Sequence, residues 1–170
     1  MTSPALEDLR RKLRAADQTL LRALDARARF PRTPWPRWPA TAPRLPAPPL
    51  DDILLAIAPP GTAADPAAAD QANHNLIAGL LARQHLARDI AEAKAEIAAA
   101  DCRPALETGD RERLLDLLTD LPAELHRLDD IRRTAPETAP ALTPDLAALL
   151  WREYLIPWAR QTEVAHLLEP

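Results

Sequence analysis

Eleven of the nineteen prolines in this 170-residue chain lie between residues 31 and 66. The run PRTPWPRWPATAPRLPAPP within that segment cannot form a helix, because proline lacks a backbone donor and its ring clashes with the preceding turn. We expect most of it to be extended. Any fold of this chain must therefore join its first helix to the later ones through an extended connection.

The composition favours helices on both sides of that connection. Leucine and alanine dominate, β-branched residues are scarce, and aromatic residues make up 4% of the chain. Such a composition is typical of all-α proteins, and the length is that of one domain with a sizeable core. We predict an all-α bundle of about four main helices plus short helices. It forms a single domain over residues 1–170, and a Pro-rich insert, residues 31–69, joins the first two main helices.

Helix start signals and apolar periodicity give the expected boundaries. Ser3 is a cap for a first helix over residues 3–30, and a second runs over about residues 70–100 until a break at Cys102-Arg103-Pro104. A third helix begins in TGDRERLLDLL. AELHRLDDIRR is a further turn or short helix, and TAPETAPAL is a loop. The last helix runs from Thr143 to about residue 168, with a kink at Pro157.

The Pro-rich insert itself allows three interpretations. It could be a disordered linker, a Pro-rich ligand for a partner domain, or an ordered strap on the bundle. A short helix at about residues 51–58 interrupts it, and Trp35 and Trp38 are suited to packing on helices. We favour the ordered strap.

Several functional classes lack a sequence signal. The net charge of −4 without a basic run argues against nucleic-acid binding. The three glycines are far apart, so there is no phosphate-binding loop, and the histidines show no zinc spacing. The single cysteine, Cys102, excludes an internal disulfide. We expect no cofactor or metal, and no signal peptide or membrane span, hence a soluble cytoplasmic protein.

The breaker-free segment LLARQHLARDIAEAKAE, residues 80–96, is the strongest candidate for a site. Arg83 and Lys94 are eleven residues apart, close to three helical turns, and so point the same way roughly 16 Å apart along the axis. Small residues such as Ala87 and Ala91 lie between them and leave room for a ligand. The two cations are either exposed side chains that cover apolar surface or a clamp for a small dianion.

Four segments together resemble the all-helical class of chorismate mutases, and its eukaryotic, fungal-type branch more than the short bacterial one. LEDLRRKLRAADQTLLRALDARARF is similar to the family's first helix, and LLARQHLARDIAEAKAE to its second catalytic helix, with an Arg and a Lys eleven apart. GDRERLLDLL is similar to the helix that bears a substrate-binding acid. LTPDLAALLWREYLIPWARQTEVAHLL is similar to the last helix, including its Ile-Pro and its Glu-Val-x-x-Leu-Leu ending.

The resemblance implies a role for each matching position. Arg10 matches an arginine that reaches one substrate carboxylate, and Arg83 matches the arginine that holds the other. Lys94 matches the lysine that donates to the ether oxygen and a carboxylate. Glu112 matches the acid that accepts from the ring hydroxyl. Glu163 matches the second partner of the ether oxygen, so Lys94, Glu163 and Arg83 are the expected catalytic residues.

Two positions depart from the family pattern. On the third helix the leucines come one residue early, so Glu107, Thr108 or Arg111 could face the substrate in place of Glu112. Ala159 stands at a substrate-binding position where the family usually has Thr or Ser, so one hydroxyl contact is lost. We include Arg111, Glu112 and Ala159 among the expected binding residues.

The implied activity is the pericyclic rearrangement of chorismate, a dianion, to prephenate in aromatic amino-acid biosynthesis. An isochorismate-pyruvate lyase of the same fold and a non-catalytic helical binding or regulatory module remain as alternatives. Because the Pro-rich insert separates the first two helices, we expect each site to be complete within one chain. The chain is too short to hold all the regulatory segments of fungal-type enzymes, so we expect no feedback control. Whether it forms a homodimer stays open.

Overall fold

The computed structural model describes residues 3–39 and 45–169, and most of them are helical. The helices are α1 Pro4–Ala28, α2 Leu50–Ile57, α3 Pro66–Ile97, α4 Ala99–Thr108, α5 Arg111–Leu118, α6 Leu121–Thr138, α7 Pro144–Leu150 and α8 Ile156–Leu167, with a π-helical turn, Trp151–Leu155, between the last two. Within the described ranges, the only β-type pairing is an isolated bridge between Thr33 and Thr62. The prediction of an all-α fold is confirmed.

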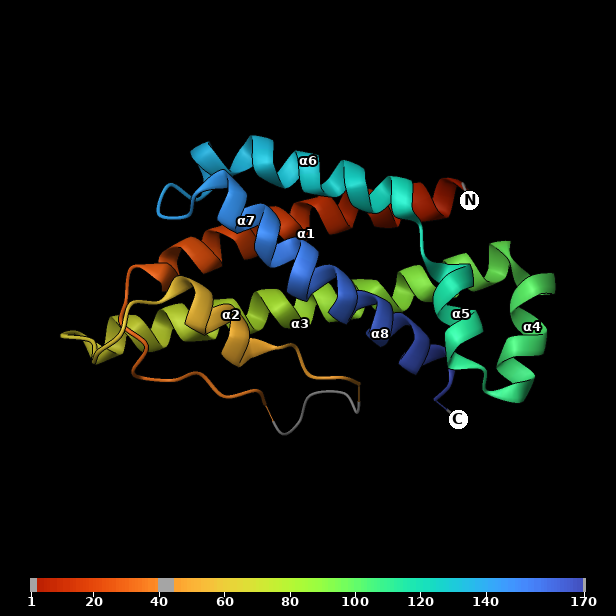
Figure 1. Ribbon diagram of the computed structural model, residues 1–170, viewed down its shortest axis with the longest axis horizontal. Coiled ribbons are helices and arrows are strands. Elements are labelled where there is room, and N and C mark those ends of the chain that lie inside the picture. Colours follow the sequence, from red (N-terminus) through yellow and green to blue (C-terminus); the bar gives the residue numbers. More distant parts are fainter. Residues whose placement is uncertain (1–2, 40–44, 170) are drawn as a thin grey trace.

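The long helices α1 and α3 lie side by side along the molecule and form its most extensive helix–helix contact (Figure 1). Their approach is close at Gly79, where an added Cβ would lie 3.2 Å from Leu20 Cδ1. Helix α6 packs on α1, and α7 packs on α6. Helix α8 continues across the bundle to contact α3 and α5. Helices α1, α3, α6 and α8 thereby surround a common interior.

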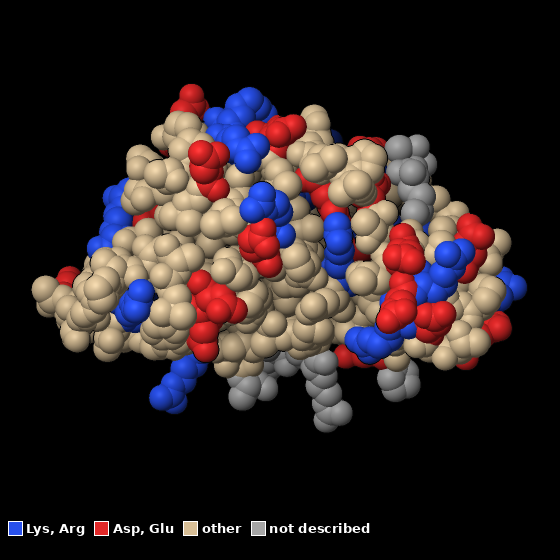
Figure 2. Space-filling view, in the orientation of Figure 1, with Lys and Arg blue, Asp and Glu red and all other residues tan. Residues whose placement is uncertain are grey.

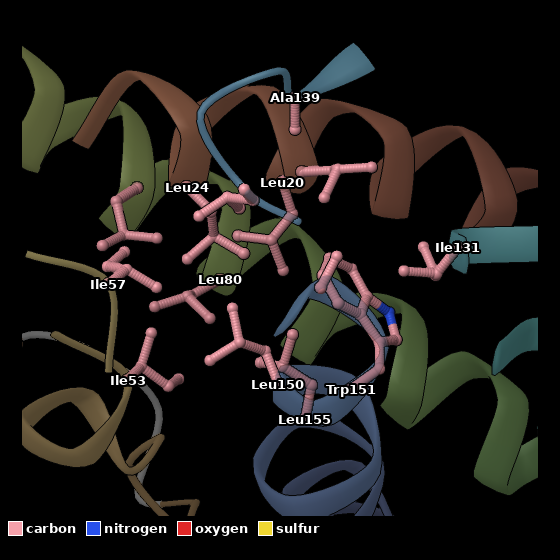
Figure 3. Packing of buried hydrophobic residues seen from close by; sticks show 14 of the residues in the cluster. Leu20, Leu24, Ile53, Ile57, Leu80, Ile131, Ala139, Leu150, Trp151 and Leu155 are labelled. Carbon is pink, nitrogen blue, oxygen red and sulfur yellow. The ribbon is translucent and has the colours of Figure 1, made fainter. Parts of the chain in front are cut away.

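The main apolar core lies where α1, α2, α3 and the α7–α8 segment meet (Figure 3). Leu20 and Leu24 from α1 and Leu80 from α3 are fully buried against Trp151 of the π-helical turn. Burial of such side chains is the main source of folding free energy. A separate small cluster of buried residues holds α4 and α5 against the end of α8.

The start of the Pro-rich segment is fastened to the bundle by a buried arginine. Arg27, at the end of α1, is fully buried. Its Nε donates to Asn73 of α3 at 2.6 Å, and its Nη1 and Nη2 donate to the carbonyls of Phe30 and Arg32, both at 2.9 Å. These bonds satisfy the buried cation and turn the chain away from α1 into the Pro-rich segment.

The described parts of the Pro-rich segment pack on α8, as the strap hypothesis expects. The Trp38 ring meets Trp158 edge-on, with ring centroids 6.3 Å apart and an interplanar angle of 88°. Trp158 Nε1 donates to the Pro46 carbonyl at 2.7 Å, and Leu45 is buried. Trp35 is exposed, so only one of the two tryptophans packs as expected. Residues 40–44 of the predicted strap lie outside the described residues.

Two prolines do not interrupt helices where the sequence predicted. The break after the second main helix falls at Ala98, and Pro104 lies inside α4. Helix α6 continues through Pro136 to Thr138, so it is a main helix, and only residues 139–142 of the predicted loop lie outside a helix. In each case the proline removes one hydrogen bond whose carbonyl, four residues earlier, belongs to an exposed residue that water can reach.

The expected kink near Pro157 takes the form of the π-helical turn just before it. The Ile156 N–H donates to the Trp151 carbonyl, five residues back. Pro157 follows directly inside the same continuous helix, so its missing N–H removes one backbone hydrogen bond to the preceding turn.

Replacing Trp38 tests the packed strap. Trp38→Ala should lower the free energy of unfolding by about 2 kcal/mol, less than the cost at a fully buried tryptophan, because Trp38 is half-buried. It should also make the segment around residues 31–49 more sensitive to brief proteolysis. Trp35→Ala is the matched control, because that side chain is 38% exposed. Equal effects of the two changes would contradict a strap held by Trp38.

Candidate functional site

Helices α1, α3, α6 and α8 enclose a cavity of about 60 Å³ that is lined by many charged residues. Five of the residues expected from sequence line it: Arg10 from α1, Arg83 and Lys94 from α3, and Ala159 and Glu163 from α8. Arg10 and Glu163 are 153 residues apart in the chain, and the fold brings both to the same cavity.

Lys94 and Glu163 form a buried ion pair between α3 and α8. Lys94 Nζ lies 2.7 Å from Glu163 Oε2 and also donates to the Leu118 carbonyl at 2.7 Å. The two side chains are 10% and 8% exposed. Burial raises the pKa of the Glu163 carboxyl, and the positive charge of Lys94 only partly opposes that shift. Glu163 therefore binds a proton more readily than an ordinary glutamate.

Arg83 shares a buried carboxylate with a second arginine. Asp17 of α1 accepts from Arg83 Nη1 with one oxygen and from Arg127 Nη1 of α6 with the other, the latter at 2.5 Å. Burial lowers the pKa of Arg83, and Asp17 opposes that shift. The Arg83 Nε is buried without a hydrogen-bond partner, which leaves a donor that an incoming ligand can satisfy.

The remaining cavity cations are paired with two acids at the start of α6. Arg10 Nη2 donates to Asp120 Oδ2. Arg160 of α8 holds Glu124 with two bonds, from Nε to Oε1 at 2.7 Å and from Nη2 to Oε2. Both acids line the cavity, as do Arg127 and Arg160. None of these four residues was expected from the sequence to be a site residue.

The expectation that Arg111 or Glu112 faces the ligand is corrected by this geometry. Both are exposed on α5 and neither lines the cavity, and Glu107 and Thr108 are exposed on α4. The apolar side of α5 is buried with α4 and α8, so its charged side points away from the bundle interior.

A local signal for the two acids that line the cavity is present in DLPAE. Asp120 caps α6, with its side chain accepting from the Ala123 N–H at 3.1 Å. Glu124 follows four residues later, on the same helical face. The expected turn or short helix is the start of α6, and its helical spacing aligns the two acids.

Every cation that lines the cavity is paired with an acid of the same chain. Arg10 also pairs with the more exposed Glu7, and Arg83 and Arg127 share Asp17, so the five cationic side chains meet five carboxylates and their formal charges balance. Protonation of Glu163 would leave a surplus of one positive charge. The cavity as it stands holds only a few water molecules, so a larger anion has to displace carboxylates from their arginines as it enters.

Other kinds of site have no counterpart in the described part of the chain. Residues 3–39 and 45–169 contain no group of three or more His, Cys, Asp or Glu placed to hold a metal ion. None of the helices described is long and apolar enough to cross a membrane. On the face drawn in Figure 2, cationic and anionic side chains are interspersed.

The chain has the fold of the all-helical chorismate mutases. It matches the chloroplast chorismate mutase of Zea mays with a TM-score of 0.80 and 18% identity, covering 97% of this chain and 94% of that one. The plant enzyme AtCM1, with tyrosine bound in an allosteric site, matches with a TM-score of 0.79 and 16% identity over 98% and 96%. The chorismate mutase of Candida albicans, in complex with L-tryptophan, matches with a TM-score of 0.75 and 15% identity, covering 96% of this chain and 90% of that one.

No protein-family model matches the sequence, and no curated protein matches it. The resemblance to the fungal-type branch is thus confirmed by the fold, with plant and fungal enzymes as its structural relatives.

The Lys94–Glu163 pair should make stability depend on pH. Lys94→Met leaves Glu163 buried and unpaired, so it should cost about 3 kcal/mol of unfolding free energy at pH 7. Loss of Lys94 also raises the pKa of Glu163 further, because Lys94 lowers it in the parent. The carboxyl is then protonated over a wider range, and the cost should be smaller at pH 5. Urea unfolding at both pH values measures this difference.

Two further variants control that experiment. Lys12→Met removes a mostly exposed lysine of α1 that pairs with Asp8, and it should change stability by less than about 0.5 kcal/mol. Lys94→Met combined with Glu163→Leu should regain much of the loss, because no buried charge is left alone. A pH-independent cost for Lys94→Met would count against a buried pair.

Proposed function

We propose that this protein is a chorismate mutase that rearranges chorismate to prephenate in aromatic amino-acid biosynthesis. The observation that carries the proposal is the convergence of Arg10, Arg83, Lys94 and Glu163 on one cavity. Each was expected there from its own sequence segment, and the fold is shared with plant and fungal chorismate mutases. We further propose that residues 1–170 act as one domain and need no cofactor.

The reaction requires no general acid–base step, and the main task of the enzyme is to position the substrate. One C–O bond breaks while one C–C bond forms within the same molecule, and no nucleophile attacks. The enzyme must hold the dianion in a compact, chair-like conformation and stabilise negative charge that grows on the ether oxygen. Arg10 and Arg83 are suited to the two carboxylates, as guanidinium groups bind carboxylates strongly and with fixed geometry.

Lys94 and Glu163 are suited to the ether oxygen. Lys94 Nζ is a buried donor next to Glu163, and it can turn from Oε2 to a ligand oxygen within the same space. A charged Glu163 would repel the growing negative charge, so it must be protonated to donate a hydrogen bond. Burial favours that neutral form. Ala159 adds a methyl group to the cavity wall and no hydroxyl contact.

A direct assay tests the proposal. Purified protein is mixed with chorismate and, in a separate reaction, with isochorismate; loss of the ultraviolet absorbance of each compound is followed, and the products are identified. Prephenate supports the mutase. Salicylate and pyruvate formed from isochorismate, with chorismate unchanged, would replace it with the lyase alternative. No turnover of either compound would contradict both enzymes and leave a non-catalytic module.

Activity should fall as pH rises through the pKa of Glu163 in the substrate complex, because only the protonated carboxyl can donate to the ether oxygen. Glu163→Gln keeps the shape and donates at every pH, so it should retain activity near neutral pH with a flat profile. Glu163→Ala should be poor at every pH. The measurement is kcat/KM across the pH range for all three proteins, and overlaying profiles for parent and Glu163→Gln would remove Glu163 from the mechanism.

Each active site should be complete within one chain, since α1, α3, α6 and α8 of the same chain all contribute to the walls of the cavity. Arg10→Ala and Lys94→Ala should each be inactive, and a mixture of the two should stay inactive after refolding together. This holds whether the protein is a monomer or a homodimer. Activity regained by mixing would mean that two chains share residues in one site.

A further inference from the structure

Asp17 differs from the acids that line the cavity because it serves two cations. Lys94 has Glu163, Arg10 has Asp120 and the more exposed Glu7, and Arg160 has Glu124. Asp17 instead divides its two oxygens between Arg83 and Arg127. These three side chains therefore carry one more positive than negative charge.

The geometry brings the two guanidinium groups together in the cavity wall. Because each occupies one oxygen of the same carboxylate, they lie side by side, and both residues line the cavity. Their side chains are 2% and 12% exposed, so water screens them little. The charge of Arg127 lowers the pKa of Arg83, as expected for two like charges in close proximity.

We propose that Arg127 and Arg83 form a two-arginine site for one carboxylate of the substrate, with Asp17 as the residue that positions both guanidinium groups. This inference rests on the proposed function, and it names a further residue of the substrate site. When the ligand carboxylate binds, the two arginines face two anions, Asp17 and the ligand, and the charges of the group balance. The unpartnered Nε of Arg83 shows that this arginine still has a donor to offer.

Arg127 also determines how free Arg83 is to bind a ligand. With Arg127 present, Asp17 is divided between two arginines. Without it, Asp17 and Arg83 form a closed pair with no net charge, and a carboxylate has to compete with Asp17 for Arg83. A role for Arg127 that is limited to neutralising Asp17 would predict the same competition, but it would also predict full recovery of binding once Asp17 is removed as well.

The test compares kcat and KM for chorismate in the parent, Arg127→Gln and Arg127→Lys. Arg127→Gln should raise KM about tenfold or more and lower kcat by less than about threefold, because the carboxylate is held alike before and during the rearrangement. Arg127→Lys keeps the charge and should recover part of the loss. Arg132→Gln is the control, as Arg132 is on the same helix but does not line this cavity.

A double variant separates ligand binding from a structural role. In the Arg127→Gln background, Asp17→Asn releases Arg83 from its closed pair, so KM should fall, but it should stay about threefold or more above the parent value because one of the two arginines is missing. If Arg127 only neutralised Asp17, the KM of the double variant would return to the parent value. A KM for Arg127→Gln within twofold of the parent, or a double variant whose KM equals that of the parent, overturns the inference.

If the parent does not turn over chorismate, the proposed function fails, and calorimetric binding of chorismate then tests the anion site by itself. Parent binding that weakens about tenfold or more in Arg127→Gln supports the site. Equal binding by both proteins, or no binding by the parent, overturns it.

Discussion

Ion pairing across the bundle interior is the constraint on which the site depends. Lys94–Glu163 joins α3 to α8, Arg83–Asp17 joins α3 to α1, and Arg160–Glu124 joins α8 to α6. Each pair connects two helices, so the same contacts that neutralise the buried charges also set the spacing of the side chains around the cavity. A side chain that moves toward a ligand must leave a carboxylate, which makes binding and helix packing parts of one equilibrium.

Such pairs contribute little net stability, because the cost of removing two charges from water roughly offsets their attraction. The stability of this chain comes from the apolar core on the other side of the bundle, where Leu20, Leu80 and Trp151 are fully buried. The division of roles is typical of a binding site built inside a fold: one region holds the helices together, and another keeps polar groups that apolar residues would replace at lower cost. The polar region is thus best explained by a ligand.

The Pro-rich segment allows this arrangement in one chain. It turns away from α1 at Arg27, packs Trp38 on Trp158, and returns the chain to the start of α3. Helices α1 and α3 can then lie side by side, and all four walls of the cavity come from a single polypeptide. Had α1 and α3 been one continuous rod, the second wall would have had to come from another chain.

Local patterns in the sequence determined much of this protein. Periodicity and caps were enough for α1, α3 and the last helix, because a helix with one apolar face must bury that face. The eleven-residue spacing was enough to predict that Arg83 and Lys94 share a stripe, since helical geometry is nearly constant. Family resemblance then singled out Arg10, Ala159 and Glu163, which line the same cavity.

Only the tertiary structure decided which charges meet. Arg127 and Arg160 are ordinary helix-surface residues by pattern, and they become cavity residues only because α6 and α8 face the other helices of the bundle. The acids of the third wall come from the start of α6 rather than from Glu112, because α4 and α5 bury their own apolar cluster and turn their charges outward. Periodicity reports which face of a helix is buried, whereas the partner of that face depends on contacts between segments far apart in the chain.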